Sequence, residues 1–344
     1  MKHIHVLLVA VVSLSQAETS KLRVAHIGLE MDGGWSFMKQ VQEEPGAELV
    51  AVADSHPELV ERARGVTAPG TRYYGDFERM LDEVKPAAVT AALPNNEHLA
   101  VLRACARRRI HVWFQKPMAT TANDAREMER LSREAGIILM INYHPLWTAS
   151  MQAITSRIEA GEIGTVERLV MRHAFNASKV LSPYYKSYFL EPARHGGGAL
   201  MDQGTYGIDY AVFLFGRPQR VFASAKNLHD VKGLRNEDEA WAVLDYPKAT
   251  AIINGAWWSL PDTGPGIGEL TVTGTKGMLQ RATVEAALTI PPERKHGIAH
   301  FIDCVRNNRP VDAPHSAAVN VIVNEVVDAA YESIRTGQAI TLPR

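Results

Sequence analysis

The chain is poor in cysteine, the residue that small folds use for covalent and metal cross-links. Only Cys105 and Cys304 occur among 344 residues, and they stand far apart, outside the CxxC spacing of a zinc set. The sequence therefore predicts neither a disulfide framework nor a metal site. Both cysteines are expected to pack as small apolar side chains.

An excess of charge of one sign is also missing. The 37 lysines and arginines against 38 aspartates and glutamates give a formal net charge of -1, and no long run of one sign occurs. Attraction to nucleic acid or to an anionic membrane surface is therefore not expected, and a small neutral or weakly charged substrate fits better. With 46% hydrophobic residues and no internal repeat, the chain can bury a large core and is expected to form two domains.

The apolar stretch at the N-terminus is too short to span a bilayer. Lys2 and His3 precede apolar residues from Ile4 to Leu14, and Ser15-Gln16-Ala17 follows as a small-x-small cleavage pattern. We therefore expect a signal peptide over residues 1–17 and a protein that is exported, either periplasmic or secreted. The alternative is a cytoplasmic chain whose first residues are a mis-assigned start or a strand-like extension.

From Lys21 the sequence alternates short β-branched runs with amphipathic segments, which is typical of βαβ units around a parallel sheet. This pattern predicts a doubly wound α/β domain over residues 21–142. Its expected strands are Leu22–Ile27, Leu49–Ala53, Ala87–Ala92, Ile110–Phe114 and Ile137–Ile141.

The pattern of apolar residues changes after residue 142. Long alternating segments predict a large, mostly antiparallel open sheet in an α+β domain over residues 143–344. A helical segment is expected over residues 198–215, and two amphipathic helices between His296 and Arg335. The other expected elements are a helix over Met151–Ala160 and strands over Val166–Phe175, Gln219–Ala225, Ala240–Tyr246, Thr250–Trp257 and Glu269–Thr273.

The turn after the first strand aligns with the dinucleotide motif GxGxxG through Gly28 and Gly33, but Glu30 replaces the middle glycine. That glycine normally lets the backbone approach a pyrophosphate, which binds at the following helix N-terminus. Glu30 and Asp32 place two carboxylates near the expected dianion, and like charges repel. Either these side chains point away, or cofactor binding is weakened.

Asp54 ends the second strand, 54 − 28 = 26 positions after Gly28. This is close to the spacing of the acid that hydrogen-bonds a ribose 2′-OH, and an acid there repels a 2′-phosphate. The spacing therefore favours NAD over NADP. The alternative is that Asp54 caps the helix that begins near Pro57.

Three further motifs carry a resemblance to a known family. They are Pro94-Asn95-Asn96-Glu97-His98, which is similar to PNxxH, Gln115-Lys116-Pro117, which is similar to EKP, and the segment 196–209, which is similar to GGGxLxDxGxHxxD with Tyr206 at the histidine. The chain resembles the glucose-fructose oxidoreductase and inositol dehydrogenase (Gfo/Idh/MocA) family from Lys21 to its end. The resemblance implies a Rossmann domain, an α/β substrate domain, a nicotinamide dinucleotide as cofactor, and a homo-oligomer, either a dimer or a tetramer. The position of Asp54 makes NAD the expected cofactor, with NADP less favoured.

The resemblance also implies roles for individual residues. Lys116 positions and activates the substrate hydroxyl, and Gln115 replaces the glutamate that would hold this lysine charged, so we expect Lys116 to be cationic less firmly. The implied cofactor-binding residues are Gly28, Glu30, Gly33, Asp54, Pro94, Asn95, His98, Gln115 and Lys116.

Tyr206 is the candidate acid/base, with Lys116 as the cation that lowers its pKa from the usual value of about 10. Asp202 is the candidate orienting group, and on a helix it shares a face with Tyr206 and with Asp209. For Tyr206 and Asp202 the alternative is a purely structural hydrogen bond. The weaker substrate candidates, each of which could equally be packing, are Tyr143, His144, Trp147, His173 and His195.

These residues indicate hydride transfer between nicotinamide and a CH–OH carbon of a sugar or cyclitol, with no metal and no nucleic-acid or membrane partner. Two alternatives stay open. One is an enzyme of the same fold that keeps NAD bound, recycles it and cleaves a glycoside without net oxidation. The other is a carbohydrate-binding protein that has lost dinucleotide chemistry, an alternative that Glu30 and Gln115 favour.

Overall fold

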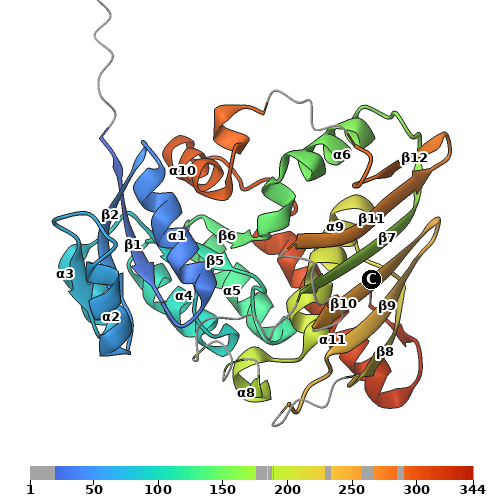
Figure 1. Cartoon of the computed structure of the whole chain (residues 1–344), viewed down its shortest axis with the longest axis horizontal. Coiled ribbons are helices and arrows are strands. Elements are labelled where there is room, and N and C mark those ends of the chain that lie inside the picture. Colours follow the sequence, from blue (N-terminus) through green and yellow to red (C-terminus); the bar gives the residue numbers. More distant parts are fainter. Residues whose placement is uncertain are drawn as a thin grey trace, which may run out of the picture.

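The computed structural model describes residues 20–175, 184, 188, 190–228, 234–257, 266–284 and 290–343. The predicted signal peptide lies outside the described residues. Two sheets with their helices form two domains that lie side by side, the first drawn in blue to green on the left of Figure 1 and the second on the right. None of the described helices is both long and apolar enough to cross a membrane.

The first sheet has the strand order β3-β2-β1-β4-β5-β6, and all neighbours pair in parallel. Its apolar strands are buried on both faces because helices cover both sides. The predicted doubly wound architecture is confirmed, and β3 is an additional strand. The strands are β1 (Leu22–Ile27), β2 (Ala47–Ala53), β3 (Arg72–Tyr74), β4 (Ala88–Ala91), β5 (His111–Gln115) and β6 (Leu139–Asn142).

The helices of this domain begin and end where the sequence supplies caps. The Thr121 hydroxyl accepts a hydrogen bond from the Asp124 N–H at the start of α5, and Gly136 ends α5 in the left-handed region at φ 65°. The helices are α1 (Asp32–Glu43), α2 (Pro57–Arg64), α3 (Phe77–Val84), η1 (Asn95–Glu97), α4 (His98–Arg107) and α5 (Ala122–Ala135).

The second sheet has the order β12-β11-β7-β10-β9-β8-β13. Its neighbours are antiparallel except β7 and β10, which pair in parallel. The expected mostly antiparallel sheet is therefore confirmed. The strands are β7 (Val166–Phe175), β8 (Arg220–Lys226), β9 (Glu239–Tyr246), β10 (Ala249–Trp257), β11 (Gly266–Gly274), β12 (Gly277–Gln280) and β13 (Ile340–Thr341).

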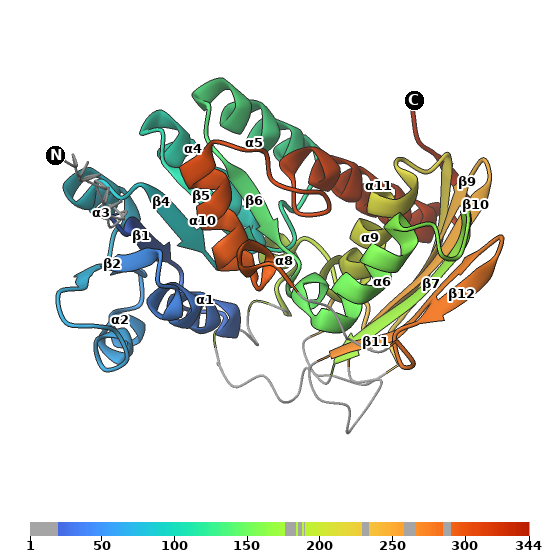
Figure 2. The same cartoon turned by 90° about the horizontal axis from the view of Figure 1, so that it is seen from above.

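Helices cover one face of this sheet, and the last two helices also reach the first domain. In Figure 2, α11 lies beside α5, while the Phe301 ring of α10 stacks on Trp113 of β5 with ring centroids 6.1 Å apart. The C-terminal segment thus ties the two domains together. The helices are η2 (His144–Trp147), α6 (Ala149–Glu159), α8 (Pro192–His195), η4 (Leu200–Gly204), α9 (Thr205–Phe215), η5 (Pro292–Arg294), α10 (Gly297–Asn307) and α11 (Ala317–Thr336).

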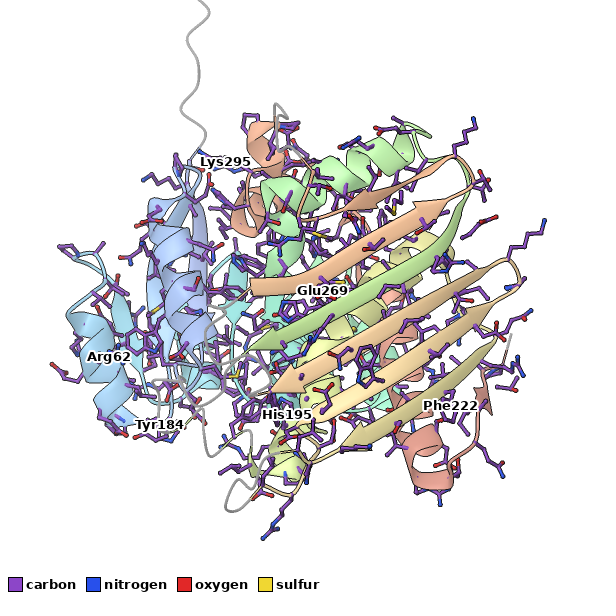
Figure 3. All side chains as sticks on the ribbon, turned by 45° about the vertical axis from the view of Figure 1, so that its right-hand side comes forward. Arg62, Tyr184, His195, Phe222, Glu269 and Lys295 are labelled. Carbon is purple, nitrogen blue, oxygen red and sulfur yellow. The ribbon has the colours of Figure 1, made fainter. Side chains whose placement is uncertain are left out.

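The opposite face of the second sheet carries large exposed apolar side chains and is seen in Figure 3, where Phe222 is labelled. Phe222 pairs with Val243 across β8 and β9, and Trp241 lies two residues before Val243 on the same face. Their exposed fractions are 46%, 37% and 44%. An exposed apolar sheet face of this kind is typical of a surface that another protein covers.

Candidate active site

The dinucleotide turn lies where the strand order reverses between β1 and β4, the position at which open parallel sheets bind ligands. Gly28 has a φ of 92°, and a Cβ on it would lie 2.4 Å from the Ala92 carbonyl oxygen. Only glycine fits this left-handed position against the end of β4. The His26 ring holds the turn from below, with Nε2 2.7 Å from the Gly28 carbonyl oxygen.

A cavity of about 350 Å³ opens beside this turn. Asp54 lines it, and its carboxylate accepts hydrogen bonds from the Leu29 N–H at 2.6 Å and the His56 N–H at 2.8 Å. His56, not Asp54, occupies the N-cap position of α2, so the capping alternative does not describe Asp54. The cavity is rich in acids, namely Glu30, Asp54, Asp76, Glu78 and Glu97.

Glu30 faces this cavity and does not point away from it, but its charge is paired. The Arg194 Nη2 atom lies 3.0 and 2.9 Å from the two Glu30 carboxylate oxygens. The ring nitrogen Nδ1 of His56 lies 3.9 Å from the same carboxylate. The partner therefore comes from α8, in the second domain.

The residues of the PNxxH-like motif after β4, residues 94–98, contact the loop after β5 and the end of α8. Pro94 precedes η1, the Asn95 Nδ2 donates to the His195 carbonyl at 2.7 Å, and Asn95 Oδ1 is buried with no partner among the described residues. The two ring nitrogens of His98 lie 3.1 Å from the carbonyl oxygens of Met118 and Leu93. Burial lowers the pKa of His98 to about 4, so the ring is neutral near pH 7 and its single N–H donates to one of these two carbonyl oxygens.

Gln115 ends β5 and lies directly under the start of α1. A Cβ on Gly33 would lie 2.6 Å from the Gln115 Nε2 atom, so a side chain there would displace the amide. The Gln115 Oε1 accepts hydrogen bonds at 3.2 Å from the Lys116 N–H and from Asn142 Nδ2. Gln115 thus joins the dinucleotide turn to the residue that follows it, Lys116.

Lys116 and Asp202 form a buried ion pair, and the exposed fractions of their side chains are 8% and 5%. The Lys116 Nζ atom lies 2.5 Å from Asp202 Oδ1 and 2.6 Å from the Asp202 carbonyl oxygen. Burial opposes the charged form, but the Asp202 carboxylate outweighs it and raises the pKa of Lys116. The expectation that Gln115 leaves Lys116 weakly cationic is therefore wrong, because Asp202 supplies the missing carboxylate.

Asp202 is held by two further donors. Trp257 Nε1 donates to Asp202 Oδ2 at 2.7 Å, and Gln203 Nε2 donates to the same oxygen at 2.5 Å. Burial alone would favour the neutral acid, but Lys116 and, to a smaller extent, the hydrogen bond from Gln203 lower the pKa of Asp202. The carboxylate is therefore ionised and fixed in orientation.

Tyr206 lies against this pair. The Lys116 Nζ atom is 4.6 Å from the centroid of the Tyr206 ring, and the His173 ring centroid is 4.2 Å from it. Burial raises the pKa of Tyr206, and the opposing effect of Lys116 is smaller. The predicted neighbours are thus brought together, but the expected net lowering of the Tyr206 pKa does not occur in this structure.

His173 presents a free acceptor nitrogen beside Tyr206. Its Nδ1 contacts Gln203 Oε1, which can only accept, so Nδ1 carries the hydrogen. Its Nε2 is buried with no partner among the described residues. Burial lowers the pKa of His173 to about 4, so the ring is neutral. The nitrogen is therefore available to a hydroxyl group that enters the site.

The helical spacing predicted after the glycines is only partly right. Residues 200–204 form a turn of π-helix, and the regular α-helix begins at Thr205. The wider turn separates Asp209 from the bonds that surround Asp202, and both Asp209 carboxyl oxygens are buried without a partner among the described residues. Burial raises the pKa of Asp209 well above its usual value and so favours the neutral acid.

The weaker substrate candidates divide into two groups. Tyr143 is buried at the site, with its ring 5.8 Å from Tyr206, and His195 lies where the two domains meet, 5.6 Å from Trp257 (Figure 3). His144 is exposed. Trp147 lies in a different cluster, stacked on His315 with ring centroids 4.2 Å apart.

Several supporting residues were not singled out from the sequence. A Cβ on Gly197 would lie 2.0 Å from the Tyr331 hydroxyl, and Glu237 accepts hydrogen bonds from that hydroxyl at 2.8 Å and from the Leu200 N–H at 3.0 Å. These contacts explain why the glycines precede η4. Gln203 and Arg194 have no local sequence signal, since their partners come from distant segments.

Comparisons with known proteins agree with this geometry. Residues 22–143 match the model of an oxidoreductase family with an NAD-binding Rossmann fold, and residues 151–280 match the GFO/IDH/MocA C-terminal domain. The chain belongs to the Gfo/Idh/MocA family of oxidoreductases.

Individual relatives are distant but cover most of the chain. D-xylose 1-dehydrogenase (NADP(+)) 2 of Haloferax volcanii is 27% identical over 292 residues, 78% of this chain and 84% of the relative. D-apiose dehydrogenase of Paraburkholderia graminis is 26% identical over 331 residues, 86% and 84% of the two chains. The crystal structure of aldose-aldose oxidoreductase from Caulobacter crescentus complexed with glycerol has a TM-score of 0.78 at 26% identity, covering 94% of this chain and all of that one.

Proposed function

We propose that this Gfo/Idh/MocA oxidoreductase transfers hydride between nicotinamide and a CH–OH carbon of a sugar or cyclitol. The observation that carries the proposal is the buried Lys116–Asp202 ion pair beside Tyr206 at the carboxyl end of β5. A buried, paired lysine next to Tyr206 and His173, which can both hydrogen-bond a hydroxyl group, is suited to a polar neutral substrate. The names of the relatives, a xylose and an apiose dehydrogenase, support a sugar-like substrate.

The residues of the first domain fit a dinucleotide. The turn at Gly28 stands at the reversal of strand order, and the cavity beside it has Asp54 at the end of β2. Asn95 supplies a buried acceptor without a partner among the described residues, which a ligand can satisfy. The nicotinamide, when bound, accepts or donates the hydride.

NAD is the proposed cofactor, because the cavity is lined by carboxylates. Asp54, Glu30 and Glu97 all border it, and a 2′-phosphate would add negative charge among them. Arg194 is the cation that faces these acids, and it is already paired with Glu30 and lies 3.5 Å from Glu97. Some relatives use NADP, as the name of the xylose dehydrogenase shows, so the preference is a property of this cavity.

The side chains of the site have complementary roles in the proposed reaction. Lys116 stays cationic and stabilises negative charge on the substrate oxygen, and Asp202 keeps Lys116 charged and in place. The Tyr206 hydroxyl exchanges the proton with the substrate hydroxyl. His173 Nε2 accepts a hydrogen bond from a second hydroxyl of the substrate, and this bond orients the substrate ring.

A single-turnover experiment tests the proposal. The chain from Glu18 onward is mixed with NAD and with aldoses, alkyl glycosides or cyclitols, and reduced nicotinamide is followed by its absorbance. We expect reduction with at least one of these classes, and reduction that is slower on the order of 10³-fold with the Lys116→Met variant. Equal rates for the two proteins would contradict the assigned roles.

Net NAD reduction also separates this function from its alternatives. A glycoside-cleaving enzyme that recycles NAD releases a sugar without accumulating reduced cofactor, and a binding protein does neither. The names of the relatives are those of oxidoreductases and favour neither alternative.

We also propose a homo-oligomer in which the open face of the second sheet is covered. The exposed apolar residues Phe222, Trp241 and Val243 lie together on this face, which supports the assignment. Export directed by residues 1–17 remains part of the proposal. The oligomer is tested by light scattering, where a Trp241→Lys, Val243→Lys double variant is expected to be smaller than the unchanged protein.

A further inference from the structure

The turn that should bind the cofactor contains a carboxylate where a dinucleotide motif has glycine, and the structure shows how that carboxylate is tolerated. Glu30 is nearly buried, with 9% of its side chain exposed, and its two oxygens lie 3.0 and 2.9 Å from Arg194 Nη2. The pair is separated by 164 positions in the chain. Glu30 belongs to the first domain, whereas Arg194 belongs to the second.

The short helix α8, which carries Arg194, is held against the first domain. The Asn95 side chain of the first domain donates to the carbonyl of His195, the residue after Arg194, at 2.7 Å. Arg194 also lies 3.5 Å from Glu97, so its guanidinium bridges the loops that follow β1 and β4. These two loops border the crevice in which a dinucleotide binds.

Without Arg194 this crevice would repel the proposed cofactor. Glu30, Asp54 and Glu97 line the same cavity, and a pyrophosphate would bring two more negative charges. Repulsion between like charges is strong where water is partly excluded. Asp54 accepts hydrogen bonds from N–H donors of the protein, and Glu97 is 47% exposed to solvent. Glu30 is therefore the carboxylate whose charge depends most on Arg194.

We propose that Arg194 is a positioning residue for the cofactor: it neutralises Glu30, so that dinucleotide binding requires α8 of the second domain to be docked on the turn. This inference rests on the proposed function. It has a structural consequence for the reaction site, because α8 leads through Gly196–Gly198 directly into η4, which carries Asp202. Docking of α8 therefore couples the cofactor end of the crevice to the reaction end.

A double-mutant cycle measured by calorimetric titration of NAD tests this role. The four proteins are the unchanged chain from Glu18 onward, Arg194→Ala, Glu30→Gly and the double variant. We expect Arg194→Ala to weaken NAD binding by at least about 10-fold, as removal of one partner of a close charge pair does. In the Glu30→Gly background the same change is expected to alter the dissociation constant by less than about 3-fold, because the buried carboxylate that Arg194 contacts is gone and Glu97, at 3.5 Å, is largely screened by solvent.

Matched variants separate the charge from the fold. Arg130→Ala removes an arginine that pairs with Glu127 and Glu134 on the surface of α5, and it is expected to leave NAD binding unchanged. Should Arg194→Ala fail to fold, as judged by circular dichroism, Arg194→Gln with and without Glu30→Gln repeats the cycle with smaller changes. The expected pattern is the same.

Each outcome decides the inference. An equal loss of affinity in the two backgrounds would show that Arg194 acts on the cofactor independently of Glu30 and would overturn the proposal, as would no loss at all. Tight NAD binding by Glu30→Gly, with no binding by the unchanged chain, would show that Arg194 does not compensate Glu30. The proposed function of the fold would remain intact. Absence of binding to both the unchanged chain and Glu30→Gly would overturn the proposed function together with this inference.

Discussion

The two ends of the crevice between the domains are built in different ways. At the reaction end, Lys116, Asp202, Trp257 and Gln203 form a compact set of bonds of 2.5–2.7 Å with every charge matched. At the cofactor end, acids gather around a cavity, and Glu30 is balanced by a residue of the other domain.

Each end of the crevice also contains one residue that departs from the family motif. Gln115 replaces a glutamate at the reaction end, yet the lysine keeps its charge because Asp202 is in contact with it. Glu30 replaces a glycine at the cofactor end, and its compensation depends on domain docking through Arg194. A substitution beside a preformed ion pair is absorbed locally, whereas a substitution in an open crevice needs a distant partner.

The largest expected effect is at the reaction end. Lys116→Met removes the cation and leaves Asp202 as an unpaired buried charge, which costs about 3 kcal/mol of unfolding free energy. We expect kcat to fall on the order of 10³-fold, with NAD affinity changed little. Stopped-flow reduction of NAD and calorimetry measure the two quantities. A larger loss in NAD affinity than in kcat would move Lys116 from the reaction end to the cofactor end.

The next effect concerns the proton. Because the pKa of Tyr206 is raised, its neutral form prevails at pH 7, and the rate of substrate oxidation is expected to rise with pH without levelling below about pH 10. Tyr206→Phe should lower kcat about 10²-fold and remove this rise. In the Tyr206→His variant the rate should level off near pH 6.5, because the ordinary pKa of histidine is about 6.5. A profile unchanged by either substitution would exclude Tyr206 as the proton-exchanging group.

A smaller effect is expected at the cofactor end. The carboxylates around the cavity should make the dissociation constant for NADP about 10-fold or more larger than that for NAD, since a 2′-phosphate is repelled. Asp54→Ser should narrow this difference. Titration of both dinucleotides under identical salt measures it. Tighter binding of NADP than of NAD by the unchanged protein would contradict the cofactor assignment.

A further effect is on stability in acid, and it involves residues at both ends of the crevice. Burial lowers the pKa of His26, His98, His173 and His195 to about 4, below the value of about 6.5 in an unfolded chain. The unfolded chain therefore binds more protons between these values, and the stabilisation present above pH 6.5 is lost as the pH falls towards 4. Denaturant unfolding at pH 7 and pH 5 should show a lower free energy at pH 5. Equal values would show that these rings are not neutral in the folded protein.

The sequence predicts regular elements and local motifs well, and contacts between distant segments poorly. Alternating apolar runs locate most strands because burial on a sheet imposes that pattern, but β3 has three residues and is too short to show it. The neighbourhood of Lys116, Asp202 and Tyr206 follows from the family resemblance, while the π-helical turn at residues 200–204 alters the spacing to Asp209. The partner of Glu30 lies 164 positions away in a four-residue helix, and no periodic pattern marks it.

The proposed function requires first of all that the protein bind a nicotinamide dinucleotide. The chain from Glu18 onward is denatured to release any cofactor already bound, and the refolded or cofactor-free protein is titrated calorimetrically with NAD. We expect either released NAD or saturable NAD binding, with stabilisation of the folded protein by the bound ligand. Absence of released cofactor together with no binding of NAD or NADP at millimolar concentration would contradict the proposed function.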